Sequence, residues 1–210
     1  MPNNPAAKPS TFPLQDAQAR VLRFLWRSRA EWSGREIARK SGLSAPSCHA
    51  TLKKLDAGGL VEFRRVSNVH LYKINPENYL VRYVYARLFD AEGAMPKQIA
   101  ATVKKSLVDS PKSDIISIVL FGGMARGAEQ LGGDLDLLVV LPAKASLKAL
   151  EPRLALLRIL LFKQFSVPLA AHIQTLPELR SNRCRKLPLV RAILKDGRTV
   201  YGKDLKELLS

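Results

Sequence analysis

The sequence predicts an α+β protein with two folded parts and a helical connector between them. Residues 14–75 combine short helical patterns with two strand-like runs, residues 76–110 keep a helical apolar period, and residues 111–210 mix apolar strands with leucine-rich helices. Residues 1–13 contain four prolines and no apolar period, so we expect a disordered leader there.

The charge balance favours a polyanionic partner. The chain has 210 residues and a formal net charge of +16, with 34 Lys and Arg side chains against 18 Asp and Glu. Its two cysteines, Cys48 and Cys184, have no CxxC spacing, which indicates a reducing cytoplasm and no zinc site. No apolar run approaches the length of a membrane span, so we expect a cytoplasmic protein.

Residues 14–75 begin with two helical patterns. Apolar residues recur on one face over residues 14–28, which predicts the first helix. Ser33 is a suitable N-cap for the second helix, with Glu36 three residues later as in a capping box. Gly42 is expected to end this helix.

A third helix and a hairpin follow. Ser44 is expected to cap a helix that extends to about Ala57, with Pro46 in its first turn. The runs at residues 60–65 and 69–74 predict two strands joined by a short turn. The order is therefore three helices and then a hairpin.

This order, and the segment REIARKSGLSAPSCHATLKKLDAGGLVEF, resemble a winged helix-turn-helix DNA-binding domain. The resemblance implies that double-stranded DNA is the partner, with the third helix in the major groove and the hairpin at the backbone. The candidate contacts are polar or basic positions of the third helix and the hairpin: Ser47, His49, Lys53, Lys54, Arg64, Arg65, Asn68 and His70. The alternative is a protein-binding module whose charges are only solvated.

Residues 76–110 predict a long connector that Gly93 and Pro96 break into two helices. Its aromatic residues favour core packing or a homodimer seam over stacking with nucleic acid: Tyr79, Tyr83, Tyr85 and Phe89. We therefore expect a homodimer that reads two half-sites.

Two strands flank a glycine turn at residues 115–142. Gly122 and Gly123 follow the first strand, where they let backbone amides approach a ligand. Asp134 and Asp136 alternate with Leu135 at the start of the second strand, so period two puts both carboxylates on one face. Two neighbouring carboxylates are most easily explained by a divalent cation between them.

The Gly-Gly pair, ten residues and then Asp-Leu-Asp resemble the polymerase-β-type nucleotidyltransferase superfamily, and most closely the minimal nucleotidyltransferases of bacteria and archaea. The resemblance extends over residues 115–209. It implies a mixed α/β sheet, an NTP held at Gly122, Gly123 and Arg126, and Mg²⁺ bound by Asp134 and Asp136.

Two positions depart from the family pattern. Gly123 stands where the family has a phosphate-binding Ser, and the next strand, expected at residues 167–174, lacks the acid that supplies a third carboxylate. Two hypotheses therefore stay open. The protein is either a DNA-binding transcriptional regulator with a degenerate nucleotide-binding domain, or an active nucleotidyltransferase that modifies a hydroxyl on a protein, an RNA or a small molecule. A toxin-like protein is one candidate partner.

Overall fold

A computed structural model describes residues 16–109, 114–122, 134–143, 147–185 and 188–209, with the side chains of residues 147–149, 188–189 and 192 left aside. The described chain forms two compact units, Met1–Ala91 and Glu92–Ser210. Each unit has its own hydrophobic core, which is the property expected of a domain.

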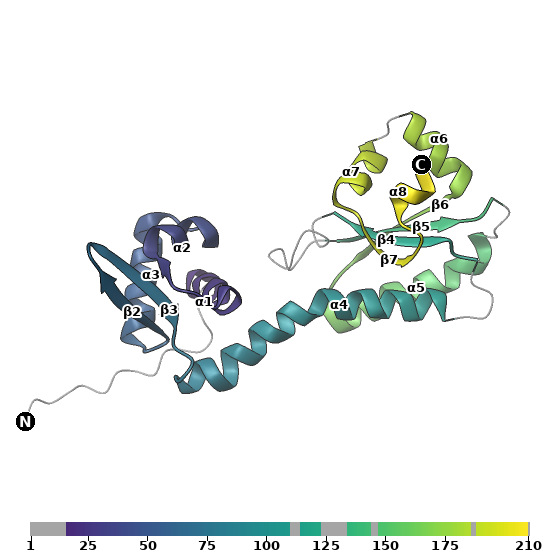
Figure 1. Cartoon of the computed structure of the whole chain (residues 1–210). Helices are drawn as coiled ribbons and strands as arrows, with labels where there is room; N and C mark the ends of the chain where they lie inside the picture. The colour runs from purple at the N-terminus through teal and green to yellow at the C-terminus, as the bar shows by residue number, and fades with distance from the viewer. Residues whose placement is uncertain (1–15, 110–113, 123–133, 144–146, 186–187, 210) are drawn as a thin grey trace, which may run out of the picture. The chain divides into compact units, whose positions relative to one another are not determined.

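The first unit contains three helices and a small antiparallel sheet (Figure 1). In chain order the elements are α1 (Asp16–Ser28), β1 (Trp32–Ser33), α2 (Gly34–Ser41), α3 (Ala45–Ala57), β2 (Val61–Val66) and β3 (Val69–Ile74). The strand order is β1-β3-β2. The predicted three helices and hairpin are confirmed, and β1 is an additional strand that the sequence did not reveal.

Capping residues fix the start of α2 and α3. The Ser33 hydroxyl accepts a hydrogen bond from the Glu36 amide, while the Glu36 carboxylate accepts one from the Ser33 amide, which completes a capping box. At the start of α3, the Ser44 hydroxyl accepts a hydrogen bond from the backbone N–H of Ser47. Gly42 lies at φ 67°, a conformation that glycine adopts without strain, and it ends α2.

One continuous helical segment joins the two units. A π-helical turn, η1 (Val81–Tyr85), leads directly into α4 (Ala86–Val108). The predicted break is wrong, because Gly93 and Pro96 both lie inside α4. Early residues of the segment, such as Tyr85 and Phe89, belong to the core of the first unit, and Ile99, Val103 and Leu107 belong to the core of the second. Packing at both ends therefore outweighs the poor helix propensity of glycine and proline.

The second unit is a four-stranded mixed sheet with helices on both faces (Figure 1). Its elements are β4 (Ser117–Phe121), β5 (Leu135–Leu141), α5 (Leu147–Phe165), β6 (Leu169–Thr175), α6 (Leu176–Cys184), α7 (Pro188–Asp196), β7 (Arg198–Gly202) and α8 (Leu205–Leu209). The strand order is β6-β5-β4-β7, and β5 and β6 are the parallel pair. The helix α6 was not predicted from the sequence.

The two faces of this sheet have separate cores. Leu135, Leu137 and Val139 of β5 pack with residues of α4 and α5. Leu138 and Val140 of the same strand pack with residues of α6, α7 and α8. By the period of two, Asp136 lies on the α6–α8 face, at the end of β5 where this core gives way to solvent.

Over the described residues, no helix is both long enough and apolar enough to cross a membrane.

Candidate functional site

The helix α3 presents the predicted contact residues to solvent. Cys48, Leu52 and Leu55 are buried against the core, and burial raises the pKa of the Cys48 thiol, which keeps it neutral. The opposite side of the helix exposes every α3 residue proposed as a contact: Ser47, His49, Lys53 and Lys54. This side of α3 is therefore free to approach a ligand.

The hairpin of β2 and β3 forms the wing. Its tip is folded by Arg65, whose guanidinium donates to the Ser67 carbonyl at 2.9 Å and to the Asn68 side-chain oxygen at 3.4 Å. Ser67 itself lies at φ 53°, in the left-handed region. Arg65, Asn68 and His70 are all exposed. The tip is thus held by hydrogen bonds from Arg65, whose positive charge is exposed there.

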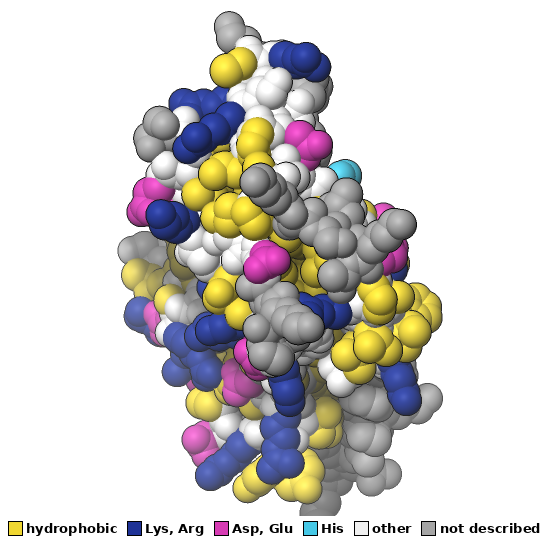
Figure 2. Space-filling model, turned by 90° about the vertical axis from the view of Figure 1, so that its right-hand side faces the viewer, with side chains coloured by type: hydrophobic (Ala, Val, Ile, Leu, Met, Phe, Trp, Pro, Cys, Tyr) yellow, Lys and Arg dark blue, Asp and Glu magenta, His cyan; other side chains and the backbone are white. Residues whose placement is uncertain are grey.

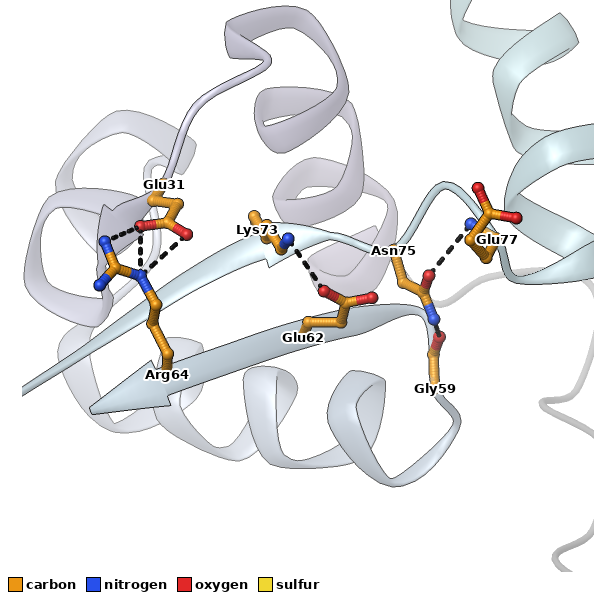
Figure 3. A network of polar contacts seen from close by, with 7 residues as sticks. All are labelled: Glu31, Gly59, Glu62, Arg64, Lys73, Asn75 and Glu77. Carbon is orange, nitrogen blue, oxygen red and sulfur yellow. Dashed lines mark hydrogen bonds and ion pairs between the residues drawn. The ribbon is translucent and has the colours of Figure 1, made fainter. Parts of the chain in front are cut away.

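Arg64 is engaged within the protein. Its guanidinium donates to both carboxylate oxygens of Glu31, with the shortest contact at 2.6 Å (Figure 3). The hydrogen bond and the charge of Arg64 hold the pKa of Glu31 below its ordinary value, and Glu31 raises the pKa of Arg64 in return. This ion pair distinguishes Arg64 from Arg65. The charge of Arg64 is already balanced by Glu31, whereas Arg65 donates to uncharged groups.

Figure 3 also shows how the base of the wing is fixed. Lys73 on β3 pairs with Glu62 on β2 at 3.1 Å. The side-chain Nδ2 of Asn75 donates to the Gly59 carbonyl, and its side-chain Oδ1 accepts from the backbone N–H of Glu77. These contacts tie the wing to the end of α3, so the angle between them is set by the fold.

A groove of about 600 Å³ lies between the start of α2, the exposed side of α3 and the wing. Its lining residues are Ser33, Gly34, Arg35, Ala45, His49, Leu52, Asn68, Val69, His70 and Tyr72. Leu52 and Tyr72 are buried and form an apolar floor, while Arg35, His49 and His70 are exposed at the rim. Phe63 supports this side of the wing, with its ring 5.3 Å from that of His70.

Three predicted contact residues line the groove: His49 from α3, and Asn68 and His70 from the wing. The groove also adds Arg35, which the sequence analysis missed. Arg35 precedes α3 by ten residues and shares no period with it, so only the packing of α2 on α3 reveals it.

In the second unit, Gly122 and Asp136 lie against each other. Phe121 pairs with Asp136 across β4 and β5, and Gly122 follows at φ 80°. A methyl group added to Gly122 would be 3.1 Å from the Asp136 carboxyl carbon and closer still to its Oδ2. The glycine therefore provides both the turn and the space for this carboxylate. Gly123 and Arg126 lie outside the described residues.

Asp134 immediately precedes β5, and Asp136 is the second residue of this strand. Asp134 is exposed and Asp136 is half-buried, with buried Leu135 between them. Two carboxylates at this spacing are a donor set that fits Mg²⁺, which proteins commonly hold with one or two carboxylates and complete with water and phosphate oxygens. Among the residues that the structure describes, no group of three or more His, Cys, Asp or Glu side chains gathers at one point.

The neighbouring strand β6 contributes no acid to this face. Ala170 pairs with Asp136 in the parallel register, and His172 and Gln174 follow on the same face. The His172 ring packs 5.7 Å from the ring of Phe121. The predicted departure from the family pattern thus falls directly beside Asp136.

Positive charge is not confined to one element. Figure 2 shows one face of the molecule, on which Lys and Arg side chains are spread widely with Asp and Glu side chains among them. The surface of α3 and the wing is therefore distinguished less by its total charge than by the groove beside it, which the exposed Arg35 of α2 lines, whereas Arg64 is paired with Glu31.

Comparison with known proteins identifies each unit. Residues 12–69 match the MarR family, and residues 101–199 match the nucleotidyltransferase domain. Among solved structures, a chain from a crystal structure of a toxin–antitoxin with AMP-PNP is 17% identical, with a TM-score of 0.35, over 52% of this chain and 80% of that chain. No curated protein matches the sequence. The chain joins a MarR-type winged-helix domain to a nucleotidyltransferase domain.

Proposed function

We propose that the protein is a DNA-binding transcriptional regulator whose nucleotidyltransferase domain binds a magnesium nucleotide. The observation that carries the DNA half is the groove between α2, α3 and the wing, with Arg35, His49 and His70 at its rim. Hydrogen-bond donors at a groove edge suit phosphate oxygens, and the exposed side of α3 has the dimensions of a helix that enters the major groove. A regulator of this kind acts on chromosomal DNA, so we expect it in the cytoplasm.

The candidate contacts have different roles. Ser47 and His49 lie near the N-terminal end of α3, the part of a recognition helix that meets base edges. Lys53 and Lys54 lie further along and suit the phosphate backbone, as does Arg65 at the wing tip. Arg64 would have to leave Glu31 before it could contact DNA, so we assign it a structural role.

The test is the salt dependence of DNA affinity. A labelled duplex of about two helical turns is titrated with the full chain by fluorescence anisotropy. In a variant with Lys53→Gln, Lys54→Gln and Arg65→Gln, the slope of log K against log salt should become shallower by about 1 for each phosphate that is no longer neutralised.

The matched control is the double variant Glu31→Gln and Arg64→Gln, which removes an ion pair and leaves the net charge unchanged. Its salt slope should stay within experimental error of the wild type. An unchanged slope in the triple variant, or an equal effect in the control, would count against the assigned surface.

The nucleotide half rests on the contact between Gly122 and Asp136. The open backbone of the turn and the two carboxylates are the features needed to hold the phosphates and Mg²⁺ of an NTP. The metal ion would neutralise phosphate charge, and Asp134 and Asp136 would hold it. Because β6 places Ala170 and His172 where an acid could complete the site, we propose binding without efficient turnover.

Calorimetry with ATP and the other NTPs, with and without Mg²⁺, tests this half. Asp136→Asn should reduce magnesium-dependent affinity by at least ~10–100-fold, the loss that even outer partners of a metal site commonly cause. Release of pyrophosphate that disappears in Asp134→Asn and Asp136→Asn would instead establish the second candidate function, transfer of a nucleotide to a hydroxyl of a protein, an RNA or a small molecule.

Two winged-helix domains are needed to read two half-sites at once, so we also propose that the protein works as a homodimer.

A further inference from the structure

The helix α5 (Leu147–Phe165) is apolar on two opposite sides. Leu154, Leu157 and Leu161 are fully buried in the core beneath the sheet. The outer side carries four large apolar residues that are exposed by the following fractions: Leu156 61%, Ile159 62%, Leu160 36% and Phe162 63%. A surface helix of a monomeric domain normally carries polar residues on its outer side, so this face requires an explanation.

The four exposed side chains form one stripe. Leu156, Ile159 and Leu160 are spaced by three and four residues, and Phe162 follows Ile159 by three, which places them on one side of the helix. Together they expose roughly 400 Å² of contiguous apolar surface, a size that is often functional when it occurs on a single protein.

We propose that this stripe is the surface through which two copies of the protein associate, with the two α5 helices antiparallel about a two-fold axis at Ile159. The inference rests on the proposed homodimer and names its interface.

The spacing of the stripe favours a second copy as the occupant. Leu156 and Phe162 are each three residues from Ile159. A two-fold axis at Ile159 therefore pairs the two Ile159 side chains at the centre. On either side of this pair, Leu156 of one copy lies opposite Phe162 of the other. These central pairs are apolar on both sides, so the middle of the stripe is self-complementary, as a two-fold interface requires.

The charges around the stripe permit this contact despite the net charge of +16. Arg158, at the edge of the stripe, pairs with Glu151 of the same helix at 3.7 Å. Lys163 is long enough to extend its ammonium group past the apolar surface. A nucleic acid or an anionic membrane would instead need a basic border along the stripe, and the Arg158–Glu151 pair weakens such a border.

The area is consistent with a reversible dimer. Two stripes contribute roughly 800 Å², which falls in the range of weak, transient interfaces below about 1,200 Å². The connector, which is the alternative dimer interface, exposes fewer large apolar residues. Tyr85 and Phe89 are used in the core of their own unit, which leaves Tyr79, Tyr83 and Leu88 as its exposed apolar residues.

Sedimentation velocity over a concentration series tests the proposal. Wild-type protein should show a monomer–dimer equilibrium, and Ile159→Asp should weaken it by at least ~100-fold, because a central anchor typically contributes tenfold or more and the substitution acts twice. The matched control is Leu88→Asp, which places the same charge on another exposed leucine, outside α5.

A cross-link reports the geometry independently of affinity. In a Cys184→Ser background, where Cys48 remains buried, Ile159→Cys should be joined to its counterpart by a short bismaleimide, and Gln164→Cys should not. A wild-type monomer at every concentration would overturn the homodimer and its surface together. A dimer that survives Ile159→Asp and dissociates with Leu88→Asp would overturn the surface alone. Flotation of a monomer with anionic phospholipid vesicles would reassign the stripe to lipid.

Discussion

Replacement of Gly122 by alanine tests the local geometry of the nucleotide site. The residue lies at φ 80°, where a side chain costs about 1–2 kcal/mol. The new methyl group would also overlap the Asp136 carboxylate, whose carboxyl carbon would be 3.1 Å away. Because a half-buried carboxylate can rotate, we expect Asp136 to turn aside rather than the backbone to shift. The backbone strain should therefore lower the stability of Gly122→Ala by about 1–2 kcal/mol. Displacement of the Asp136 carboxylate should remove most of the magnesium-dependent nucleotide affinity.

Gly202→Ala separates the two effects. Gly202 lies at φ 78°, and a methyl group there would meet the backbone of Ile116 and come within 3.0 Å of the Ser117 Cα. Backbone atoms of a paired strand cannot turn aside, so the left-handed strain adds to an overpacking cost and we expect a loss of about 2–5 kcal/mol. Nucleotide affinity should persist under conditions where this variant is folded, because the methyl group is not beside Asp136.

The assay can use the position of the tryptophans. Both of them, Trp26 and Trp32, lie in the first unit, so their fluorescence follows that unit during unfolding in urea. Circular dichroism follows the helices of both units. Gly122→Ala should shift the dichroism transition more than the fluorescence transition. Gly93→Ala is the control, because a methyl group at this position inside a helix has no neighbour within 4 Å. This variant should raise the free energy of unfolding by about 0.5–1 kcal/mol. A Gly122→Ala variant with unchanged stability and nucleotide affinity would refute the contact between Gly122 and Asp136.

Three further predictions concern other parts of the molecule. Tyr85→Phe should raise the free energy of unfolding by about 1 kcal/mol in urea titrations, because the Tyr85 hydroxyl is buried without a hydrogen-bond partner among the described residues; a decrease of similar size would imply a partner. Acidification should destabilise both units, since hydrogen bonds in the capping boxes hold the pKa of Glu36 and of Glu178 below the usual 4.5. A carboxyl whose pKa is lowered by folding stabilises the protein above its unfolded pKa and loses this contribution as pH falls, so Glu36→Gln should flatten the thermal-melting profile below about pH 5, and an unchanged profile would contradict the role of the box. Arg35→Gln should make the salt slope of DNA binding shallower by about 1 although Arg35 lies outside the recognition helix, whereas an unchanged slope would remove it from the interface.

Local signals predicted much of the winged-helix unit. The capping box of Ser33 and Glu36, and Ser44 before Pro46, were sufficient to place the starts of α2 and α3. A similar signal was overlooked at Thr175, where Glu178 three residues later and an intervening proline mark the start of α6. By contrast, β1 consists of two residues and exists only because Trp32 and Ser33 pair with β3.

The connector shows the limit of propensity. Gly93 and Pro96 are strong breakers in sequence, yet α4 continues through both. The reason is tertiary: the segment before them is anchored by Phe89 in one core, and the segment after them by Ile99 and Val103 in another. Neither anchor can be read from the residues around the break.

The candidate site was predictable in kind and less so in detail. Leu135 is buried between exposed Asp134 and half-buried Asp136, and the prediction that both carboxylates share one face stays a prediction because Asp134 precedes β5. The ion pair between Arg64 and Glu31 joins residues 33 apart in sequence and reassigns a candidate DNA contact, which no pattern around Arg64 suggests. Arg35 enters the groove for the same reason, through the packing of α2 on α3.

The most direct test of the regulator hypothesis is the ratio of the protein's affinity for a specific DNA sequence to its affinity for a scrambled one. Duplexes bound by the full chain are enriched from a randomised pool, and the affinity for the enriched sequence is compared with that for a scrambled duplex at a fixed, physiological salt concentration. We predict enrichment of one sequence and an affinity at least ~10³-fold higher than for the scrambled duplex, as sequence readout by a recognition helix requires. Equal affinities for the two duplexes would contradict this function and leave only electrostatic attachment to DNA.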